Sequence, residues 1–333
     1  MGRVAIIGEG VIGTSTALAI KKILPDVKIT IFYDRPFEKI CSAMPAGLFR
    51  FDNINDREDA KATFKWYADL HRQQPGDVTG VKLLSGHIQS DSKEALDHQE
   101  RAYGDIVYNF RYLNDYERQS LFPEPSRYAI HFSAFAAEGN RYVPFLKEQL
   151  LRQGVSFVQR TVASVDELAE EGYDVVVNCA GLNGGKLAGD DDSCYPIRGV
   201  VFEVDAPWHK HFNYRDFCTF TIPKNDRVVV GSVKQANRSD TKITDEDRAD
   251  IWQRYGALHP VLKSAKVTSE WCGLRPGRPS IRVECHTKRY KSGKKFTVVH
   301  NYGHGGSGFT TGWGTALRAA AFVKQAIRPK SQL

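Results

Sequence analysis

The sequence predicts an α/β plus α+β architecture, in which a doubly wound parallel-sheet domain is interleaved with an antiparallel-sheet domain. Residues 3–34 read as strand, glycine turn, helix and strand. The apolar runs at 174–178 and 296–299 predict two further strands of this type, far along the chain. Residues 195–235 instead predict antiparallel strands. Because the strand–helix elements occur at both ends and in the middle, we expect two spatial domains with interleaved sequences.

The individual elements follow from hydrophobic pattern and from helix and turn signals. Residues 4–7 are apolar at every position, as in a strand covered on both faces, and 28–33 form the next strand, ending at Asp34. Helices are expected at 14–24, which Pro25 stops, and at 59–74, 143–153 and 315–327. Strand pieces and turns alternate over 75–130, and strands are expected at 155–158, 217–222 and 228–233.

The composition is that of a globular protein and excludes several classes. The 333 residues are 41% hydrophobic and 26% charged, and no apolar run reaches the roughly 18 residues of a membrane span. The net charge of +7 is scattered along the chain, which argues against a nucleic-acid partner. The six cysteines form no CxxC pair and are expected to be reduced thiols. We expect no metal site, because His300 and His304 lie in a glycine loop without an evident third ligand.

The first glycine motif is GEGVIG, at residues 8–13, between a strand and a helix. Gly8 and Gly10 let the backbone approach a pyrophosphate, Gly13 lets helix and strand pack closely, and the helix N-terminus attracts the phosphates. Asp34 is placed to accept hydrogen bonds from ribose hydroxyls. Glu9 must then point away or be paired. This motif does not distinguish NAD from FAD, and a glycine-rich turn in an unrelated α/β protein is the alternative.

Two further motifs bear on which cofactor and substrate the chain binds. HNYGHGGSGFTTGWG, at 300–314, follows an apolar strand and precedes a helix, so a second helix N-terminus faces the ligand. Backbone N–H groups there suit an isoalloxazine that gains negative charge on reduction, which favours FAD. GLRPGRP, at 273–279, holds Arg275 and Arg278 in a proline-stiffened stretch. Arginine binds a carboxylate through two parallel hydrogen bonds, although a structural ion pair is the alternative.

With these motifs the chain resembles the D-amino-acid oxidase and D-aspartate oxidase family. GEGVIGTSTAL, YDR, PAGL, DVVVNCAG, APWHKHF, GLRPGRP, HNYGHGGSG and WGTALRAA occur in the family's order over essentially the whole chain. The resemblance implies an FAD-dependent oxidase of D-amino acids that transfers a hydride from the substrate Cα to flavin N5. Position and electrostatics suffice for this step, so no catalytic acid–base residue is expected. The imino acid hydrolyses to a 2-oxo acid and ammonia, and dioxygen reoxidises the flavin to give hydrogen peroxide.

The resemblance also implies a set of cofactor-binding residues. They are Gly8, Gly10, Val11, Ile12, Gly13, Asp34, Arg35, Cys41, Ser42, Ala46, Gly47, Leu48, Val162, Cys179, Ala180, Gly181, Arg275, Gly303, Gly305, Gly306, Ser307, Gly308, Phe309 and Thr310. The implied FAD-binding domain is discontinuous, comprising 1–47, 135–185 and 290–327. The substrate-binding domain comprises 48–134 and 186–289, and 328–333 form a C-terminal targeting tail.

The expected substrate-binding residues are Arg275, Arg215, Lys234, Phe220, Arg50, Gly306 and Ser307. By resemblance, Arg275 binds the substrate α-carboxylate, and Phe220 stands where the family carries a tyrosine that assists it. Arg215 and Lys234 match two cations of the D-aspartate branch, and Arg50 adds a third. These cations favour D-aspartate or D-glutamate, unless they are ordinary solvated surface. A neutral D-amino-acid or glycine oxidase and a non-catalytic FAD-binding protein remain alternatives.

The last three residues, Ser331-Gln332-Leu333, resemble the SKL peroxisomal address with glutamine in place of lysine. A peroxide-forming oxidase fits a peroxisome, so we expect the peroxisomal matrix, with an import receptor as a partner. A frayed C-terminus in a cytosolic protein is the alternative.

Overall fold

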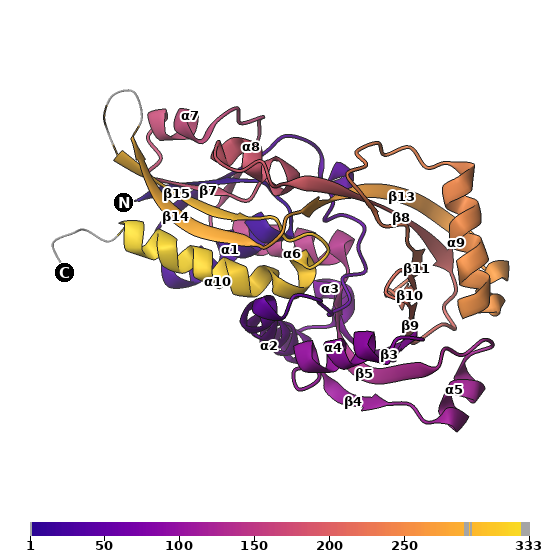
Figure 1. Ribbon diagram of the computed structural model, residues 1–333. Helices are drawn as coiled ribbons and strands as arrows, with labels where there is room; N and C mark the ends of the chain where they lie inside the picture. The colour runs from indigo at the N-terminus through magenta and orange to yellow at the C-terminus, as the bar shows by residue number, and fades with distance from the viewer. Residues whose placement is uncertain (1, 290–292, 294, 328–333) are drawn as a thin grey trace. The chain divides into compact units, whose positions relative to one another are not determined.

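A computed structural model of the chain describes residues 2–289, 293 and 295–327 (Figure 1). The chain divides into two compact units, and it passes between them four times. Unit 1 is Met1–Ala43, Tyr142–Pro196 and Arg275–Leu333, and unit 2 is Met44–Arg141 and Ile197–Leu274. The expected tail at 328–333 lies outside the described residues.

Unit 1 is built on a six-stranded sheet with the order β14-β15-β7-β1-β2-β6. All neighbouring pairs are parallel except β14 and β15. Val4, Ala5 and Ile6 of the central strand β1 are fully buried, as expected for a strand covered on both faces. The strands are β1 (Arg3–Ile7), β2 (Lys28–Tyr33), β6 (Ser156–Gln159), β7 (Val175–Asn178), β14 (Arg282–Arg289) and β15 (Lys295–Tyr302).

Helices α1 and α10 lie alongside each other in unit 1 (Figure 1). A Cβ added to Gly312 of α10 would lie 3.0 Å from Ile12 Cδ1 of α1, so glycine permits this close packing. The α-helices of unit 1 are α1 (Val11–Ile23), α7 (Val165–Glu170), α8 (Gly184–Ala188) and α10 (Gly308–Ile327), with α6 (Gly139–Arg152) continuing into it from unit 2. Short 3₁₀ turns occupy η1 (Phe37–Lys39) and η3 (Gly181–Asn183).

Unit 2 is built on a larger, mainly antiparallel sheet with the order β12-β8-β11-β10-β9-β3-β5-β4, and β13 also pairs with β8. The β3–β9 pair is parallel. Its strands are β3 (Val81–Ser90), β4 (Tyr108–Tyr112), β5 (Tyr128–Ala137), β8 (Tyr195–Asp205), β9 (Phe212–Arg215), β10 (Thr219–Pro223), β11 (Val228–Gly231), β12 (Gln235–Ala236) and β13 (Lys266–Gly277). Strands β8 and β13 each extend a few residues into unit 1.

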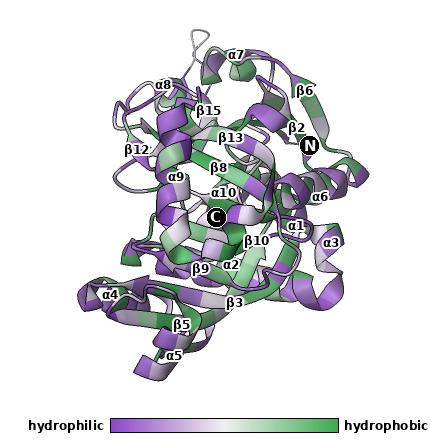
Figure 2. Cartoon of the chain, turned by 90° about the vertical axis from the view of Figure 1, so that its right-hand side faces the viewer, coloured by the Kyte–Doolittle hydropathy of each residue, from purple (hydrophilic) through white to green (hydrophobic). Residues whose placement is uncertain are grey.

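The helices of unit 2 are α2 (Arg57–Gln73), α3 (Gly76–Thr79), α4 (Lys93–Tyr103), α5 (Asp115–Leu121) and α9 (Asp245–Leu258), with 3₁₀ turns η2 (Ile54–Asp56) and η4 (Pro260–Ser264). Apolar residues, drawn green, run along β8 in Figure 2. Ile251 and Tyr255 of α9 are buried in one cluster with Phe202 of β8. This cluster forms a core of unit 2. Among the described residues, no helix is long and apolar enough to cross a bilayer.

Several expected elements have different limits, and some helices were missed. The last helix begins at Gly308 and not at residue 315, because packing on α1 outweighs the low helix propensity of glycine. The first begins at Val11 and not at 14, since Gly10 is its N-cap. Over 75–130 the chain contains helices α3, α4 and α5 as well as strands, and α9 was not expected at all. Thr244 and Asp247 form a capping box at the start of α9, a signal that could have identified it.

Candidate functional site

Four strand ends of unit 1 bring the predicted cofactor-binding segments to one edge of its sheet. Strands β15, β7, β1 and β2 are neighbours and run parallel, so their carboxyl ends meet at the same edge. Gly8 follows β1, Asp34 follows β2, Cys179 follows β7 and Gly303 follows β15. In open α/β sheets, ligands bind at this edge.

The turn between β1 and α1 requires glycine for steric reasons. Gly8 has a φ of 109°, and a Cβ there would lie 2.5 Å from the Cys179 carbonyl oxygen. A Cβ on Gly13 would collide with the Gly8 carbonyl oxygen. Two backbone segments therefore touch directly at this turn, and the first N–H groups of α1 face the sheet edge.

Ser42 supports the start of α1. Its hydroxyl accepts a hydrogen bond of 3.1 Å from the Val11 N–H, and it would lie 3.0 Å from a Cβ on Gly10. The neighbouring Cys41 is half-buried, and burial raises the pKa of its thiol although the Arg275 charge opposes this. The structure thus brings both predicted residues of this segment close to the predicted glycine turn or to Arg275.

Glu9 is paired, which removes the conflict expected for a carboxylate beside a pyrophosphate. Lys147 Nζ lies 2.8 Å from Glu9 Oε2, and the Glu9 side chain is only 3% exposed. The same ammonium group lies 5.2 Å from the ring centre of Tyr33 and 4.7 Å from that of Phe157. The charge of Glu9 is therefore neutralised inside unit 1.

Asp34 and Arg35 form an exposed ion pair after β2. Arg35 donates two hydrogen bonds, of 2.9 Å and 2.5 Å, to the Asp34 carboxylate. These bonds lower the pKa of Asp34, so the carboxylate is ionised and can accept further hydrogen bonds at neutral pH. This is the acceptor that the sequence predicts at the end of the second strand.

The second glycine motif begins as a loop and ends as a helix. Gly303 and Gly305 have φ values of 85° and 54°, which favour glycine. The Gly305 N–H donates to the Pro276 carbonyl at 2.8 Å, and a Cβ on Gly306 would lie 3.9 Å from Arg275 Cδ. The loop therefore lies directly beside the predicted carboxylate-binding arginine. Gly308, Phe309 and Thr310 form the first turn of α10.

The two histidines of this motif are structural. His300 belongs to strand β15 and not to the glycine loop, which corrects the expected placement. Its side chain lies 3.3 Å from Asn178 Nδ2, and His304 Nε2 lies 3.0 Å from Thr315 Oγ1. Burial lowers the pKa of His300 to about 4 and that of His304 to about 3, so both are neutral. Within the part of the chain that the structure describes, no group of three or more His, Cys, Asp or Glu residues could hold a metal ion.

The two arginines of GLRPGRP differ in their surroundings. Arg278 Nε lies 2.9 Å from Asp191 Oδ2 and its guanidinium also donates to the Ser280 carbonyl at 2.7 Å. Arg278 is therefore a structural ion pair, the alternative considered for this motif. Arg275 precedes Arg278 by three residues and lies near the end of β13. Its side chain lies beside Gly306 of the glycine loop.

The remaining predicted cofactor residues fall in both units. Val162 is buried in the core cluster of unit 1 that Ala180 contacts, Cys179 is buried after β7, and Gly181 begins the turn η3 with a φ of 58°. Ala46, Gly47 and Leu48 belong to unit 2, where Leu48 pairs with Ala136 of β5.

Unit 2 brings together two of the three predicted substrate cations. Arg50 forms an ion pair with Asp52, and its guanidinium carbon lies 5.0 Å from the ring centre of Phe217 and 6.0 Å from that of Tyr214. Burial would raise the pKa of Asp52, but the charge of Arg50, with a smaller contribution from Lys234, lowers it. We call Arg50, Asp52, Tyr214, Phe217 and Lys234 the Arg50 cluster.

Arg215 points elsewhere. Its guanidinium donates to the backbone carbonyl of Glu124 and to the side-chain oxygen of Gln89 at 3.4 Å. Arg215 is thus anchored to backbone and to an amide, and the structure does not bring it into contact with Arg50.

Phe220 of β10 lies opposite Tyr214 of β9 in the sheet. The two rings stack, with centres 5.0 Å apart and planes inclined by 29°. Phe220 stands where the family carries a tyrosine, and Tyr214 on the neighbouring strand supplies a hydroxyl close to that position.

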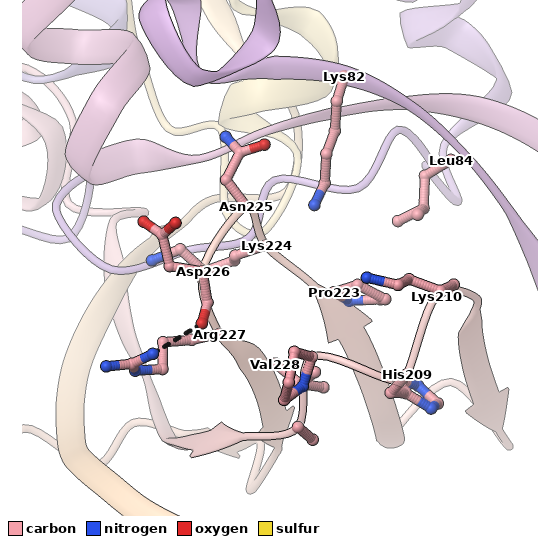
Figure 3. A pocket seen from close by; sticks show the side chains of 12 residues that line it. Lys82, Leu84, His209, Lys210, Pro223, Lys224, Asn225, Asp226, Arg227 and Val228 are labelled. Atoms are coloured by element: carbon pink, nitrogen blue, oxygen red, sulfur yellow. Dashed lines mark hydrogen bonds between the residues drawn. The ribbon is translucent and has the colours of Figure 1, made fainter.

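A separate cavity of about 260 Å³ lies in unit 2 between β3, residues 206–210 and the β10–β11 turn (Figure 3). Three of its cations face acids: Lys224 lies 2.7 Å from Glu203, Lys82 3.9 Å from Glu138, and Arg227 3.8 Å from Asp205. The lining, as far as the chain is described, includes none of the predicted site residues. Its charge is largely compensated.

Sequence reasoning missed Asp52, Tyr214 and Phe217. Asp52 lies two residues after a predicted cation, so its charge was a visible signal. The two aromatic residues lie far along the chain, in β9 and the turn after it, so tertiary contacts and not sequence proximity bring them near Arg50.

Comparison with known proteins adds four similarities. A family model described as "FAD dependent oxidoreductase" matches residues 3–322. "D-aspartate oxidase 1" of Caenorhabditis elegans is 63% identical over 326 residues, covering 98% of each chain, and human "D-aspartate oxidase" is 32% identical over 348 residues, covering 99% of each. The crystal structure of a glycine oxidase from Bacillus cereus superimposes with a TM-score of 0.78 at 18% identity, covering 98% of this chain and 96% of that one. At that identity the last similarity concerns the fold.

Proposed function

Because the chain belongs to the DAO family of FAD-dependent oxidoreductases, we propose that it oxidatively deaminates acidic D-amino acids. The observation that carries this proposal is the full-length similarity to proteins named D-aspartate oxidase, at 60–63% identity over 98% of the chain. The Arg50 cluster supports the choice of an acidic substrate, since it places a buried cation and a lysine around one carboxylate.

FAD fits the residues of unit 1. Gly8 and Gly13 leave no room for a Cβ, Gly10 as the N-cap of α1 has no side chain to cover the helix start, and Asp34 is an ionised acceptor after the next strand. We propose that the pyrophosphate binds at the start of α1 and the ribose at Asp34. We propose that Gly303, Gly305, Gly306 and Ser307 approach the isoalloxazine, whose charge on reduction the start of α10 would stabilise.

We propose that FAD is bound mainly by residues of unit 1 and that the substrate side chain is bound by residues of unit 2. The glycine-rich sheet edge supports the first assignment, and the Arg50 cluster supports the second. Of the implied cofactor residues, Ala46, Gly47 and Leu48 belong to unit 2.

Arg275 is proposed to bind the substrate α-carboxylate through two parallel hydrogen bonds. Its place beside Gly306 would hold the reacting Cα near the flavin. Arg50 and Lys234 would bind the distal carboxylate, and Arg215 would add to the positive potential from its anchored position. Tyr214 offers the hydroxyl that Phe220 lacks.

The chemistry that bound FAD supplies is the acceptance of a hydride from the substrate Cα, with dioxygen as the final oxidant. The side chains named above orient the substrate and neutralise its carboxylates, and none of them needs to exchange a proton. One D-amino acid, one water and one dioxygen give one 2-oxo acid, one ammonia and one hydrogen peroxide.

For location, we propose import into the peroxisomal matrix through Ser331-Gln332-Leu333, read by the import receptor. A fluorescent reporter carrying residues 328–333 should enter peroxisomes, and one ending in Ser331-Gln332 alone should stay in the cytosol. A cytosolic signal from both reporters would remove this part of the proposal.

The function is tested by peroxide formation from a panel of D-amino acids. We expect D-aspartate and D-glutamate to be oxidised well and D-alanine poorly. Anaerobic bleaching of the yellow protein by D-aspartate would separate a catalyst from a non-catalytic FAD-binding protein.

A further inference from the structure

Arg50 and Asp52 differ greatly in exposure. The side chain of Arg50 is 15% exposed, whereas that of its ion-pair partner Asp52 is 58% exposed. Asp52 therefore approaches a largely buried cation from the solvent side. A free carboxylate from solution would reach the guanidinium from that same side.

The aromatic side of Arg50 is fixed by a strained turn. Asp216 and Phe217, between β9 and β10, have φ values of 50° and 56°, which are unfavourable for residues with side chains. Ser90 Oγ donates to the Asp216 carboxylate at 2.8 Å, and the Asp216 N–H donates to the Gln89 carbonyl at 3.1 Å. These contacts hold the Phe217 ring against Arg50. Strain of this kind persists where a precise placement is needed.

Asp52 is held less firmly. Residues 50–53 belong to neither a helix nor a strand. Besides Arg50, one described residue, Gln99, donates to the Asp52 carboxylate, from Nε2 at 3.2 Å, while His98 Nε2 lies 2.5 Å from the Asp52 backbone carbonyl oxygen. Lys234 is exposed and, among the residues that the structure describes, forms no ion pair of its own. A rotation of the Asp52 side chain would thus free Arg50 without moving a strand or helix.

We propose that Asp52 is an internal counter-ion of Arg50, which the distal carboxylate of the substrate displaces, so that Asp52 sets the preference between acidic and neutral D-amino acids. This inference rests on the proposed function. In the free protein, Asp52 compensates the buried charge of Arg50, whose removal from water would otherwise be unfavourable. Asp52 is a positioning and competing residue and not a catalytic one.

The exchange favours acidic substrates for a simple electrostatic reason. A dicarboxylic substrate replaces the Asp52 carboxylate at Arg50, and the number of ion pairs is conserved. A neutral substrate cannot replace it, and Arg50 stays with Asp52. Since Asp52 competes with the distal carboxylate, its neutralisation should strengthen the binding of dicarboxylates alone.

The test compares wild type with Asp52→Asn, both as holoenzymes. For D-aspartate we expect KM to fall about tenfold with kcat within about twofold, while KM for D-alanine stays within about twofold. Malonate, a dicarboxylate probe, should bind about tenfold more tightly by flavin absorbance titration, and propionate should not change. The malonate titration does not depend on turnover.

Two variants serve as controls. Asp105→Asn removes a different Arg–Asp pair of unit 2, the one with Arg57. It should change neither the KM for D-aspartate nor the binding of malonate. Asp52→Glu keeps the competing charge and should leave the KM for D-aspartate at or above the wild-type value. If Asp52→Asn does not fold, Asp52→Ser provides a second neutral side chain with the same expectation.

A higher KM for D-aspartate, or weaker malonate binding, in the neutral variants would overturn the inference, because Asp52 would then merely orient Arg50. Equal changes for malonate and propionate would also overturn it. If wild type does not oxidise D-aspartate at all, the proposed function fails, while malonate binding still decides the role of Asp52.

Discussion

The glycine-rich edge of unit 1 and the Arg50 cluster of unit 2 are specified in different ways. At the edge, the backbone itself makes the site, and a Cβ at Gly8 or Gly13 would collide with neighbouring carbonyl groups. In the cluster, side chains dominate: a cation and a carboxylate two residues apart meet two rings from a segment far along the chain. Steric requirements therefore dominate the first region, whereas charge balance dominates the second.

The largest expected effect is the loss of stability when a glycine of unit 1 that touches backbone is replaced. Gly13 is such a glycine, and Gly306 is the comparison. Gly13→Ala should lower the free energy of unfolding by about 3 kcal/mol and abolish FAD binding, because its Cβ meets the Gly8 carbonyl. Gly306→Ala should leave the unfolding free energy nearly unchanged, since the nearest described atom, Arg275 Cδ, is 3.9 Å away. Denaturant unfolding measures the free energy of unfolding of each variant, and flavin absorbance measures its FAD binding. Equal destabilisation by the two changes would contradict the comparison.

The next effect concerns Arg275. Arg275→Gln should lower kcat/KM by about 10²- to 10³-fold for D-aspartate and D-alanine alike, because both carry the α-carboxylate. Arg278→Gln is the matched control, and it should act on stability through Asp191 and not on substrate KM. Steady-state peroxide assays distinguish them, and a loss confined to D-aspartate would reassign Arg275 to the distal carboxylate.

A smaller, selective effect is expected from the cation of the Arg50 cluster that is exposed. Lys234→Met should raise KM for D-aspartate and D-glutamate about tenfold and leave D-alanine unchanged, since only the dicarboxylates reach this charge. Lys93→Met removes an exposed lysine that pairs with Asp97 and should have no such effect. An equal rise of KM for all three substrates would show that Lys234 is not selective.

The smallest effect is a pH dependence of stability that arises from unit 1. The pKa values of His300 and His304 are lowered to about 4 and about 3, while the unfolded chain has ordinary histidines. As the pH falls below about 6.5, the unfolded state takes up protons first, so each group lowers the unfolding free energy by roughly 1.4 kcal/mol per pH unit. Stability should be complete above pH 6.5 and fall towards pH 4. His304→Gln should reduce the slope, as measured by denaturant unfolding at several pH values.

The same difference explains which features could be predicted from the sequence. The strand, glycine turn and helix at the N-terminus were predictable, because close backbone contacts leave glycine at fixed spacings. The family resemblance is confirmed by the family model and the relatives. The start of α10 was not predictable from propensity, since Gly308, Gly312 and Gly314 disfavour a helix that packing on α1 stabilises.

The ion-pair partners of the charged residues were the features least predictable from the sequence. Glu9 was expected to be paired or turned away, but Lys147, 138 residues later, could not be named as its partner. The role of Arg50 and Lys234 as substrate cations stays a prediction, and the Asp52 partner of Arg50 was overlooked. Long-range partners depend on tertiary contacts, which a single sequence does not reveal.

The cations of this protein are proposed to select acidic D-amino acids. The most direct measurement is kcat/KM for D-aspartate and D-alanine, from peroxide release by the FAD-loaded full chain at one pH. We expect kcat/KM for D-aspartate to exceed that for D-alanine by at least about tenfold, the effect of one well-placed charge pair. Equal values, or a preference for D-alanine, would contradict it.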